Sequence, residues 1–392
     1  MRLLFPYMAR WRSANWSRYH HLLTALARRG HQIVVLQAPP LPGARETNYI
    51  DLDAPLPAGI EVVDLRVPAA LWRPTWPLDK LAKKGLVTLA AWRTVRALAR
   101  QGAVDVLLLY NVPQLVLARA FSGTLVVDLA DDLLAMLEHE AGPLARPLLV
   151  PPAAWAFRAL VDSAQVVTVA ASVMADRLDG RAVVLPNGVD LAATARADGS
   201  AIRARYPGPL LGYVGAFEYF VDFDLVLDVA ARLPACTVLL VGGGRRWSAV
   251  QAGARRRGLT NVHFTGPVPY AAALDHMAAL DVALVPFTRG RVADAISPLK
   301  LFEYLAVGTP VVSTPAEEAQ RLAADWALFG STPGEWVTLV EALLRDPALG
   351  AQQVARARAD LAAHYQWDHL AAQLEALMAG AHARGAPTRG AR

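Results

Sequence analysis

Short runs of apolar residues recur along the chain, and the segments between them have helical spacing. In the first half the runs are Leu3–Phe5, Ile33–Leu36, Val104–Leu109, Leu125–Val127 and Val166–Val169. In the second half they are Leu210–Val214, Val238–Val241, Val262–Phe264, Val282–Val285 and Val311–Val312. Continuous apolar strands that alternate with helices are typical of parallel sheets covered on both faces. The pattern predicts an α/β fold with two Rossmann-like, doubly wound domains.

The helices are predicted from their apolar faces and stop signals. Residues 13–29 place Leu22, Leu23 and Leu26 on one face and end before Gly30. Further helices are predicted at 79–100, 333–345 and 366–379.

The segment 294–314 contains a helix with well-defined ends. Ser297 suits the N-cap and Pro298 the first helical position, while Gly308 and Pro310 end the helix. The apolar positions Leu299, Phe302, Leu305 and Ala306 recur at helical spacing and are expected to pack inward.

Two charged residues of this helix, Lys300 and Glu303, are three positions apart and therefore neighbours. A helix N-terminus attracts anions, and a lysine there strengthens the attraction. A carboxylate one turn further in is able to accept two hydrogen bonds from a ribose diol. The arrangement favours a nucleotide site, and the alternative is an exposed ion pair on an amphipathic helix.

The run from Ser297 to Val312 resembles the donor-nucleotide motif of GT-B glycosyltransferases of group 1, the family 4-like set. The resemblance implies two Rossmann-like domains that face each other across a cleft. It also implies that Glu303 holds the ribose of a nucleotide-sugar. The segment Gly266–Tyr270, with Val268 at its centre, resembles the base-binding loop of the family, and Val184–Asp190 resembles the end of its first domain.

Glycines at strand ends add to the predicted donor site, because a missing side chain lets a ligand approach the backbone. Gly215, Gly242 and Gly243 hold such positions, although tight turns alone would also explain them. Arg289 precedes the helix and is placed to reach a pyrophosphate. The predicted donor-binding residues are Gly215, Gly242, Gly243, Val268, Arg289, Ser297, Leu299, Lys300 and Glu303.

The chain departs from the family pattern at two places. Family members carry an Arg and a Lys after the strand that matches Leu210–Val214, but residues 215–222 contain neither. They also carry a Glu where this chain has Ala295. Phosphate neutralisation is therefore assigned to Lys300, Arg289 or Arg245, while donor-sugar recognition and the stereochemical outcome stay open.

Acidic residues follow the strand Leu125–Val127, at the strand end where open α/β sheets bind ligands. Asp131 or Asp132 is expected to cap the next helix, which leaves at least one carboxylate for substrate. Asp131 is the candidate catalytic base if the enzyme inverts. No Asp-x-Asp is present here, so a metal-independent reaction is expected, without a cofactor.

Candidate ligand contacts of the first domain lie in the loop and helix after the first strand. They are Arg10, Arg12, Trp16, Arg18, His20 and His21, and the alternative is that they decorate a surface.

The charge of the chain is uneven, with a formal net charge of +5. The segment 71–101 has seven Lys or Arg residues against Asp79 alone, and Trp72 and Trp76 precede its helix. This composition favours an anionic membrane surface, and a solvated helix is the alternative. With one cysteine, Cys236, and no secretory signal or transmembrane stretch, the expected location is cytoplasmic or peripheral at the inner membrane face.

The expected domains are residues 1–190 on the acceptor side, a linker at 191–208 and a nucleotide-sugar-binding domain at 209–365. A helix at 366–380 is expected to cross back to the first domain, before a disordered tail at 381–392. The predicted function is transfer of a sugar from a nucleotide diphosphate-sugar to a cell-surface glycan or lipid-linked acceptor, with no nucleic-acid partner. A GT-B-like nucleotide-sugar 2-epimerase and a degenerate nucleotide-sugar-binding partner are the alternatives. Hydride transfer is disfavoured, because neither half opens a helix with Gly-x-Gly-x-x-Gly.

Overall fold

The chain folds into two compact units, Met1–Leu185 with Asp368–Arg392 (unit 1) and Pro186–Trp367 (unit 2). The structure is a computed structural model that describes residues 1–392 except 13–15, 41–55, 69, 73–78, 207 and 386–392. Among the described residues, no helix is both long and apolar enough to cross a membrane.

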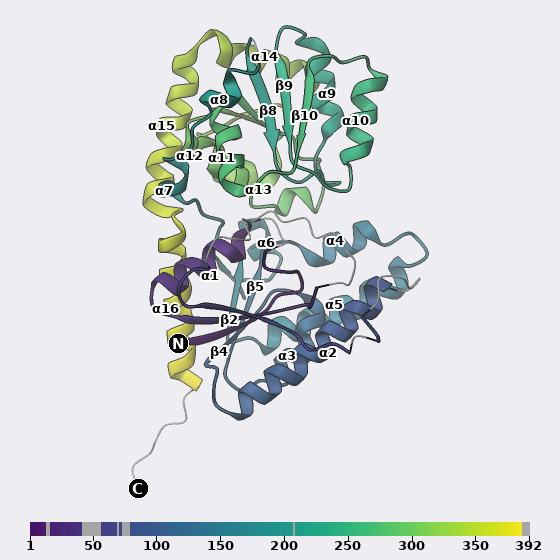
Figure 1. The fold of residues 1–392 in the computed structure, drawn as a ribbon, viewed down its shortest axis with the longest axis vertical. Coiled ribbons are helices and arrows are strands. Elements are labelled where there is room, and N and C mark those ends of the chain that lie inside the picture. The colour runs from purple at the N-terminus through teal and green to yellow at the C-terminus, as the bar shows by residue number, and fades with distance from the viewer. Residues whose placement is uncertain (13–15, 41–55, 69, 73–78, 207, 386–392) are drawn as a thin grey trace. The chain divides into compact units, whose positions relative to one another are not determined.

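Unit 1 is built on a sheet of seven parallel strands in the order β3-β2-β1-β4-β5-β6-β7 (Figure 1). The strands are β1 Arg2–Pro6, β2 Gln32–Gln37, β3 Ile60–Asp64, β4 Val106–Leu109, β5 Thr124–Leu129, β6 Val166–Val169 and β7 Val183–Val184. Consecutive residues of β4, β5 and β6 are buried, so both faces of the sheet are covered. The order reverses between β1 and β4, which is the doubly wound arrangement predicted from the apolar runs.

The helical elements of unit 1 connect these strands. They are α1 Arg18–Arg28, α2 Asp79–Arg100, η1 Val112–Gln114, α3 Leu115–Ala118, α4 Leu133–Glu140, α5 Arg146–Ser163 and α6 Ser172–Asp176. The predicted helix 79–100 is confirmed as α2. Helix α1 begins at Arg18 rather than at residue 13, and residues 13–15 of that prediction lie outside the described residues.

Helix α16 (Trp367–Gly385) begins in unit 2 and continues into unit 1. On unit 1, Glu375 forms an ion pair with Arg29 and a hydrogen bond with the His31 ring. Ala381 is buried, and the helix continues to Gly385, where the sequence suggested that a disordered tail had begun. The rest of that predicted tail, residues 386–392, lies outside the described residues.

Unit 2 is built on a sheet of six parallel strands in the order β10-β9-β8-β11-β12-β13. The strands are β8 Leu210–Val214, β9 Thr237–Val241, β10 Val262–Gly266, β11 Val282–Val285, β12 Val311–Ser313 and β13 Leu328–Phe329. The two parallel sheets confirm the predicted α/β fold with two Rossmann-like domains.

Helices cover both faces of the unit 2 sheet (Figure 1). They are α7 Leu191–Thr194, α8 Ser200–Arg203, α9 Phe223–Arg232, α10 Trp247–Arg256, α11 Tyr270–Ala278, η2 Ala293–Ala295, α12 Leu299–Val307, α13 Glu317–Ala323, α14 Pro333–Arg345 and α15 Pro347–His364. One apolar cluster includes α11, α12 and α15, and the other includes α9 and α14. The segment 191–208, predicted as a linker, contains α7 and α8 and belongs to unit 2.

Candidate functional site

Helix α12 begins one residue later than the sequence indicated. Pro298 occupies the N-cap, and Leu299 is the first helical residue. Ser297 instead contacts Asn187, whose side-chain amide donates to the Ser297 carbonyl at 2.9 Å and whose backbone N–H donates to the Ser297 hydroxyl at 3.4 Å. The prediction that Ser297 caps the helix is wrong. Its polar atoms instead connect the start of α12 to Asn187, which lies next to the first residue of unit 2.

The ammonium of Lys300 lies between two aromatic rings. Its Nζ is 5.1 Å from the ring centre of Tyr213 and 5.3 Å from that of Phe287. Cations are attracted to the faces of such rings, so the two aromatic residues hold the lysine head in one place. Burial lowers the pKa of Lys300 from 10.5 to about 8, and the charge of Glu303 opposes the change.

Glu303 is buried, and its Oε1 atom has no hydrogen-bond partner among the residues that the structure describes. Burial raises the pKa of Glu303 from 4.5 to about 7, while the Tyr270 hydroxyl and the Lys300 charge lower it. A buried acceptor without a partner is costly, and a ligand hydroxyl would satisfy it. The carboxyl group is therefore a strong candidate for a ligand contact.

The glycines at the strand ends are held in tight mutual contact. A Cβ on Gly242 would lie 2.0 Å from the Gly215 carbonyl oxygen, and its φ of +128° also favours glycine. Gly242 donates from its N–H to the Gly266 carbonyl at 3.0 Å, and a Cβ on Gly243 would lie 3.1 Å from the Pro267 ring. These contacts join the loops after β8, β9 and β10. The tight packing of the loops accounts for Gly242 without a ligand.

The remaining predicted donor residues have different surroundings. Arg289 donates to the Ser331 hydroxyl at 2.7 Å, so its guanidinium is engaged in the loop after β13. Val268 packs, half-buried, against the apolar cluster that includes α12. Leu299 is also half-buried, and the inward face of α12 is formed instead by Leu301, Phe302, Tyr304, Leu305 and Ala306.

Two residues of this site were missed by sequence reasoning. Tyr213 and Phe287 have the sequence surroundings of ordinary core aromatic residues, and only the fold brings them to Lys300.

Arg245 forms an ion pair with Glu218, with 3.3 Å between Nε and Oε2. Glu218 is therefore partly neutralised by a cation from the loop after β9.

In unit 1, the acidic residues after β5 have separate roles. Asp128 is fully buried and receives two hydrogen bonds of 2.8 Å from Arg18, with a third of 2.6 Å from Thr168. Asp132 caps α4 by accepting from Ala135 N–H at 2.8 Å, and it pairs with Arg177. Asp131 is exposed, and desolvation raises the pKa of its carboxyl although the charge of Arg18 opposes the change.

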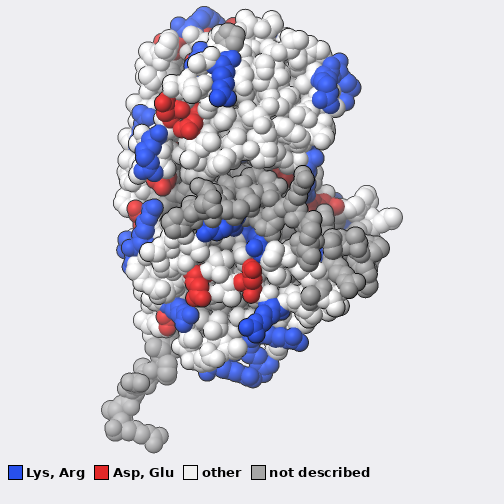
Figure 2. Space-filling model, viewed as in Figure 1, with Lys and Arg blue, Asp and Glu red and all other residues white. Residues whose placement is uncertain are grey.

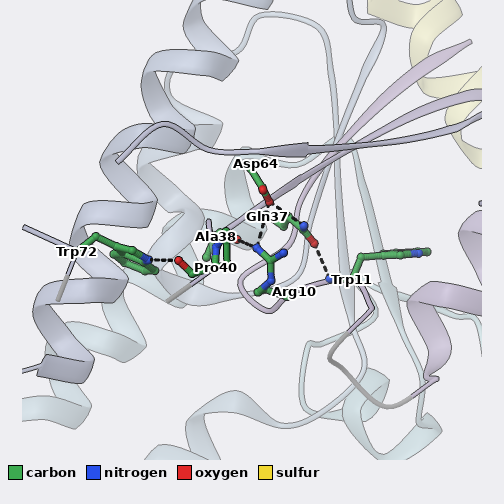
Figure 3. A network of polar contacts seen from close by, with 7 residues as sticks. All are labelled: Arg10, Trp11, Gln37, Ala38, Pro40, Asp64 and Trp72. Atoms are coloured by element: carbon green, nitrogen blue, oxygen red, sulfur yellow. Dashed lines mark hydrogen bonds and ion pairs between the residues drawn. The ribbon is translucent and has the colours of Figure 1, made fainter. Parts of the chain in front are cut away.

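The loop after β1 is held by a polar network (Figure 3). Arg10 donates to the Ala38 carbonyl at 2.6 Å and pairs with Asp64 at 3.1 Å. Gln37 bridges the same network, since it accepts from Trp11 N–H and donates to Asp64. The network joins the carboxyl ends of β1, β2 and β3, so Arg10 positions loops.

The polar residues of α1, predicted as candidate ligand contacts with surface decoration as the alternative, are buried rather than at the surface. Arg18, His20 and His21 are all buried, Arg18 because it pairs with Asp128. Burial lowers the pKa of His20 to about 4 and that of His21 to about 3, so both rings are neutral at pH 7. Trp16 stacks on His20 with 5.1 Å between ring centres. Arg12 is half-buried.

No group of His, Cys, Asp and Glu side chains suited to a metal ion occurs in the part of the chain that the structure describes.

Comparison with known proteins bears on the same region. Residues 224–376 match the model of the "Glycosyl transferase-like" family. TuaH of Bacillus subtilis, named as a teichuronic acid biosynthesis glycosyltransferase, is 28% identical over 170 residues, which are 43% of this chain and 42% of that protein. A D-inositol 3-phosphate glycosyltransferase of Mycolicibacterium vanbaalenii is 30% identical over 279 residues, 65% of this chain and 53% of that protein. The chain thus spans about half the length of these relatives.

Solved structures extend the likeness to both units. A sucrose-phosphate synthase from Thermosynechococcus elongatus superposes with a TM-score of 0.77 over 98% of this chain and 99% of its own, at 15% identity. HepE of Anabaena, solved in complex with UDP and glucose, gives a TM-score of 0.71 over 97% and 99%, at 18% identity. The chain therefore has the GT-B fold, and its residues 224–376 match a glycosyl transferase-like family. The family match within this GT-B chain includes helix α12 and therefore Lys300 and Glu303.

Proposed function

We propose that the protein transfers a sugar from a nucleotide diphosphate-sugar to a glycan or lipid-linked acceptor. The observation that carries the proposal is the pair of ionisable groups at the start of α12. Glu303 keeps a buried oxygen without a partner among the described residues, and Lys300 is held beside it by two rings. The family match over residues 224–376 supports the same reading.

On the donor side, the proposal assigns one role to each group. Glu303 accepts hydrogen bonds from the ribose hydroxyls, which removes the cost of its unpaired oxygen. Lys300 and the N-terminal N–H groups of α12 stabilise the diphosphate, most strongly when it leaves with additional negative charge. The UDP bound by HepE supports a nucleotide of this kind.

On the acceptor side, Asp131 is proposed as the base that deprotonates the attacking hydroxyl, in a reaction that needs no metal ion. Its neighbours Asp128 and Asp132 already have partners, while Asp131 is exposed at the end of β5. A cell-envelope glycan or its lipid-linked precursor is the proposed acceptor. The teichuronic acid role in the name of TuaH supports this class.

An anionic membrane surface is the proposed place of action, at the cytoplasmic face. Helix α2 supports it, since Arg93, Arg96 and Arg100 are exposed, and no Asp or Glu occurs between Lys83 and Arg100. A lipid-linked acceptor would be met at such a surface.

The test is incubation of the purified protein with a panel of nucleotide-sugars and lipid-linked acceptors, followed by mass spectrometry of nucleotide and product. Glu303→Ala should lose at least about tenfold in donor affinity, because each hydrogen bond to a charged acceptor contributes about 1.5–3 kcal/mol. Glu341→Ala is the matched control, because that glutamate is exposed and pairs with Arg345 within one helix turn. Epimerised donor without acceptor would instead select an epimerase, and binding without turnover would select a non-catalytic partner.

A further inference from the structure

Helix α5 carries large apolar side chains on its outward face. Leu148 is 74% exposed and Trp155 is 61% exposed, and Leu144, in the turn before the helix, is 90% exposed. Leu149 and the prolines at 151 and 152 are also exposed. The buried residues of α5, Leu160 and Val161, lie near its other end.

The preceding helix has the same character. Helix α4 buries Ala135, while its leucines and methionine stay half-exposed. By contrast, all residues of α1 from Arg18 to Ala27 are buried. Soluble monomers seldom gather large exposed apolar side chains in one place, and where they do, the surface usually binds something. We call residues 133–155 the α4–α5 hairpin.

Helix α2 carries a basic stripe, formed by the exposed residues Arg93, Arg96 and Arg100. Helix α3 packs against both α2 and α5. Helix α2 turns Val87, Ala91 and Val95 inward and keeps its arginines on the exposed side. Figure 2 shows Lys and Arg side chains gathered over α2, while the tip formed by the α4–α5 turn is largely uncharged. Arg146 and Arg158 add positive charge to α5, and Glu138 and Glu140 of α4 are the acidic residues of the hairpin.

We propose that the α4–α5 hairpin inserts into the interface of an anionic membrane, with the arginines of α2 on the lipid headgroups. Exposed leucines gain free energy when they enter the acyl region, and tryptophan favours the interface. Each arginine near an anionic surface adds attraction that salt screens. A second copy of the chain fits less well, because both faces would carry the same basic stripe.

The hairpin replaces the anchor expected from the sequence. Trp72 is buried and donates from its indole N–H to the Pro40 carbonyl at 3.1 Å, so it is no membrane anchor, and Trp76 lies outside the described residues. The proposal rests on the membrane part of the proposed function and adds an apolar surface, the α4–α5 hairpin, to the arginines of α2. Its tests measure lipid binding without sugar transfer, so either proposal can fail alone.

The first test places a fluorophore on the hairpin. Cys236 is the single cysteine of the chain and is buried, so Leu148→Cys offers a selective attachment point. An environment-sensitive dye there should shift its emission to the blue with vesicles of phosphatidylcholine and phosphatidylglycerol, and much less with phosphatidylcholine alone. Val183→Cys is the matched control, because Val183 is an exposed apolar residue of β7 outside the hairpin. No shift at Leu148→Cys, or equal shifts at both positions, would overturn the proposal.

The second test is flotation of the full chain with the same vesicles. Leu144→Ser combined with Leu148→Ser should weaken binding about a hundredfold, which corresponds to about 2.8 kcal/mol. Both side chains are exposed, so the fold should not change, and circular dichroism checks this. Unchanged flotation of the double variant contradicts the proposal. A second result would also contradict it: the wild-type chain is a dimer in light scattering, the double variant is a monomer, and neither binds vesicles. The face would then bind a second copy of the chain.

Discussion

The side chain of Lys300 occupies the space that any side chain on Gly215 would enter. A Cβ on Gly215 would lie 2.9 Å from Cε of Lys300 and 3.4 Å from its Nζ. The absence of a side chain at the end of β8 thus sets where the charge at the start of α12 lies. Sequence inspection gave Gly215 the role of approaching a ligand directly, whereas the structure also gives it a role through the lysine.

Gly215→Ala should therefore displace the Lys300 head and weaken donor binding by about tenfold, which is the effect of losing about 1.4 kcal/mol. Calorimetric titration with a nucleotide-sugar measures the change. Gly258→Ala is the control, because Gly258 also has a positive φ, +65°, but no atom lies within 4 Å of the added Cβ. If both variants bind the donor equally well, the proposed link between Gly215 and Lys300 is wrong.

Lys300→Ala should slow turnover about tenfold to a thousandfold, because charge develops on the leaving diphosphate in the transition state. The loss should appear in kcat as well as in donor affinity. Lys300→Arg should recover only part of the rate, since a planar guanidinium fits differently between the rings of Tyr213 and Phe287. Near-normal turnover of Lys300→Ala, with activity abolished in Arg245→Ala or Arg289→Ala, would move the diphosphate contact to another loop.

Donor binding should be strongest between pH about 7 and about 8. Below that window Glu303 takes up a proton, because burial raises its pKa to about 7, and it then accepts hydrogen bonds less well. Above the window Lys300 loses its proton, because burial lowers its pKa to about 8. Affinity measured across this range should fall on both sides. Glu303→Gln should remove the fall in affinity on the acidic side alone, and Lys300→Met the fall on the alkaline side alone. If both falls remain in the variants, these two residues do not cause the pH dependence of donor binding.

Glu303→Gln should also stabilise the fold at pH 8 by up to about 3 kcal/mol, the equivalent of the change in its pKa from 4.5 to about 7. The folded state binds this proton more tightly than the unfolded state. Its stabilising contribution is therefore complete below pH about 4.5 and is lost as the pH rises through about 7. Urea unfolding at pH 4 and pH 8 should show a gain only at pH 8. An equal effect at both values would mean that Glu303 is not destabilising when ionised.

Asp131→Asn and Asp128→Asn should affect different properties, turnover in the first variant and stability in the second. Asp131→Asn should lower kcat by about a hundredfold or more, as expected for loss of a general base, and leave unfolding nearly unchanged, because the side chain is exposed. Asp128→Asn should destabilise the fold by about 3–5 kcal/mol, because it removes the buried carboxylate charge that pairs with the guanidinium of Arg18. Turnover and urea unfolding of the two variants distinguish the roles. Full activity of Asp131→Asn would remove it from the proposed mechanism.

The sequence predicted those elements whose signal lies within one segment. The strands Leu210–Val214 and Val282–Val285 have the predicted ends, because buried parallel strands are continuous apolar runs. Strand β3 was missed because Glu61 and Asp64 interrupt its apolar residues, as an edge position allows. Lys300 and Glu303 were found together because one helix carries both.

Contacts between distant segments could not be predicted in this way. Arg18 and Asp128 are far apart in the chain, so the arginine had the sequence surroundings of a surface residue until the sheet placed it on a buried carboxylate. The rings around Lys300 come from two different strand ends. The outward leucines of α5 likewise have the composition of a core helix, and only their exposure distinguishes them.

Helix α16 has a consequence for synthesis of the chain on the ribosome. Unit 2 is one continuous segment, Pro186–Trp367, whereas unit 1 needs Asp368 and the residues after it. The emerging chain can therefore complete unit 2 first, while unit 1 still lacks Leu370, Leu374 and the carboxylate that pairs with Arg29. Until α16 leaves the exit tunnel, unit 1 stays incomplete although most of it is synthesised before unit 2. An incomplete unit 1 is therefore the part of the protein that a chaperone would be expected to bind.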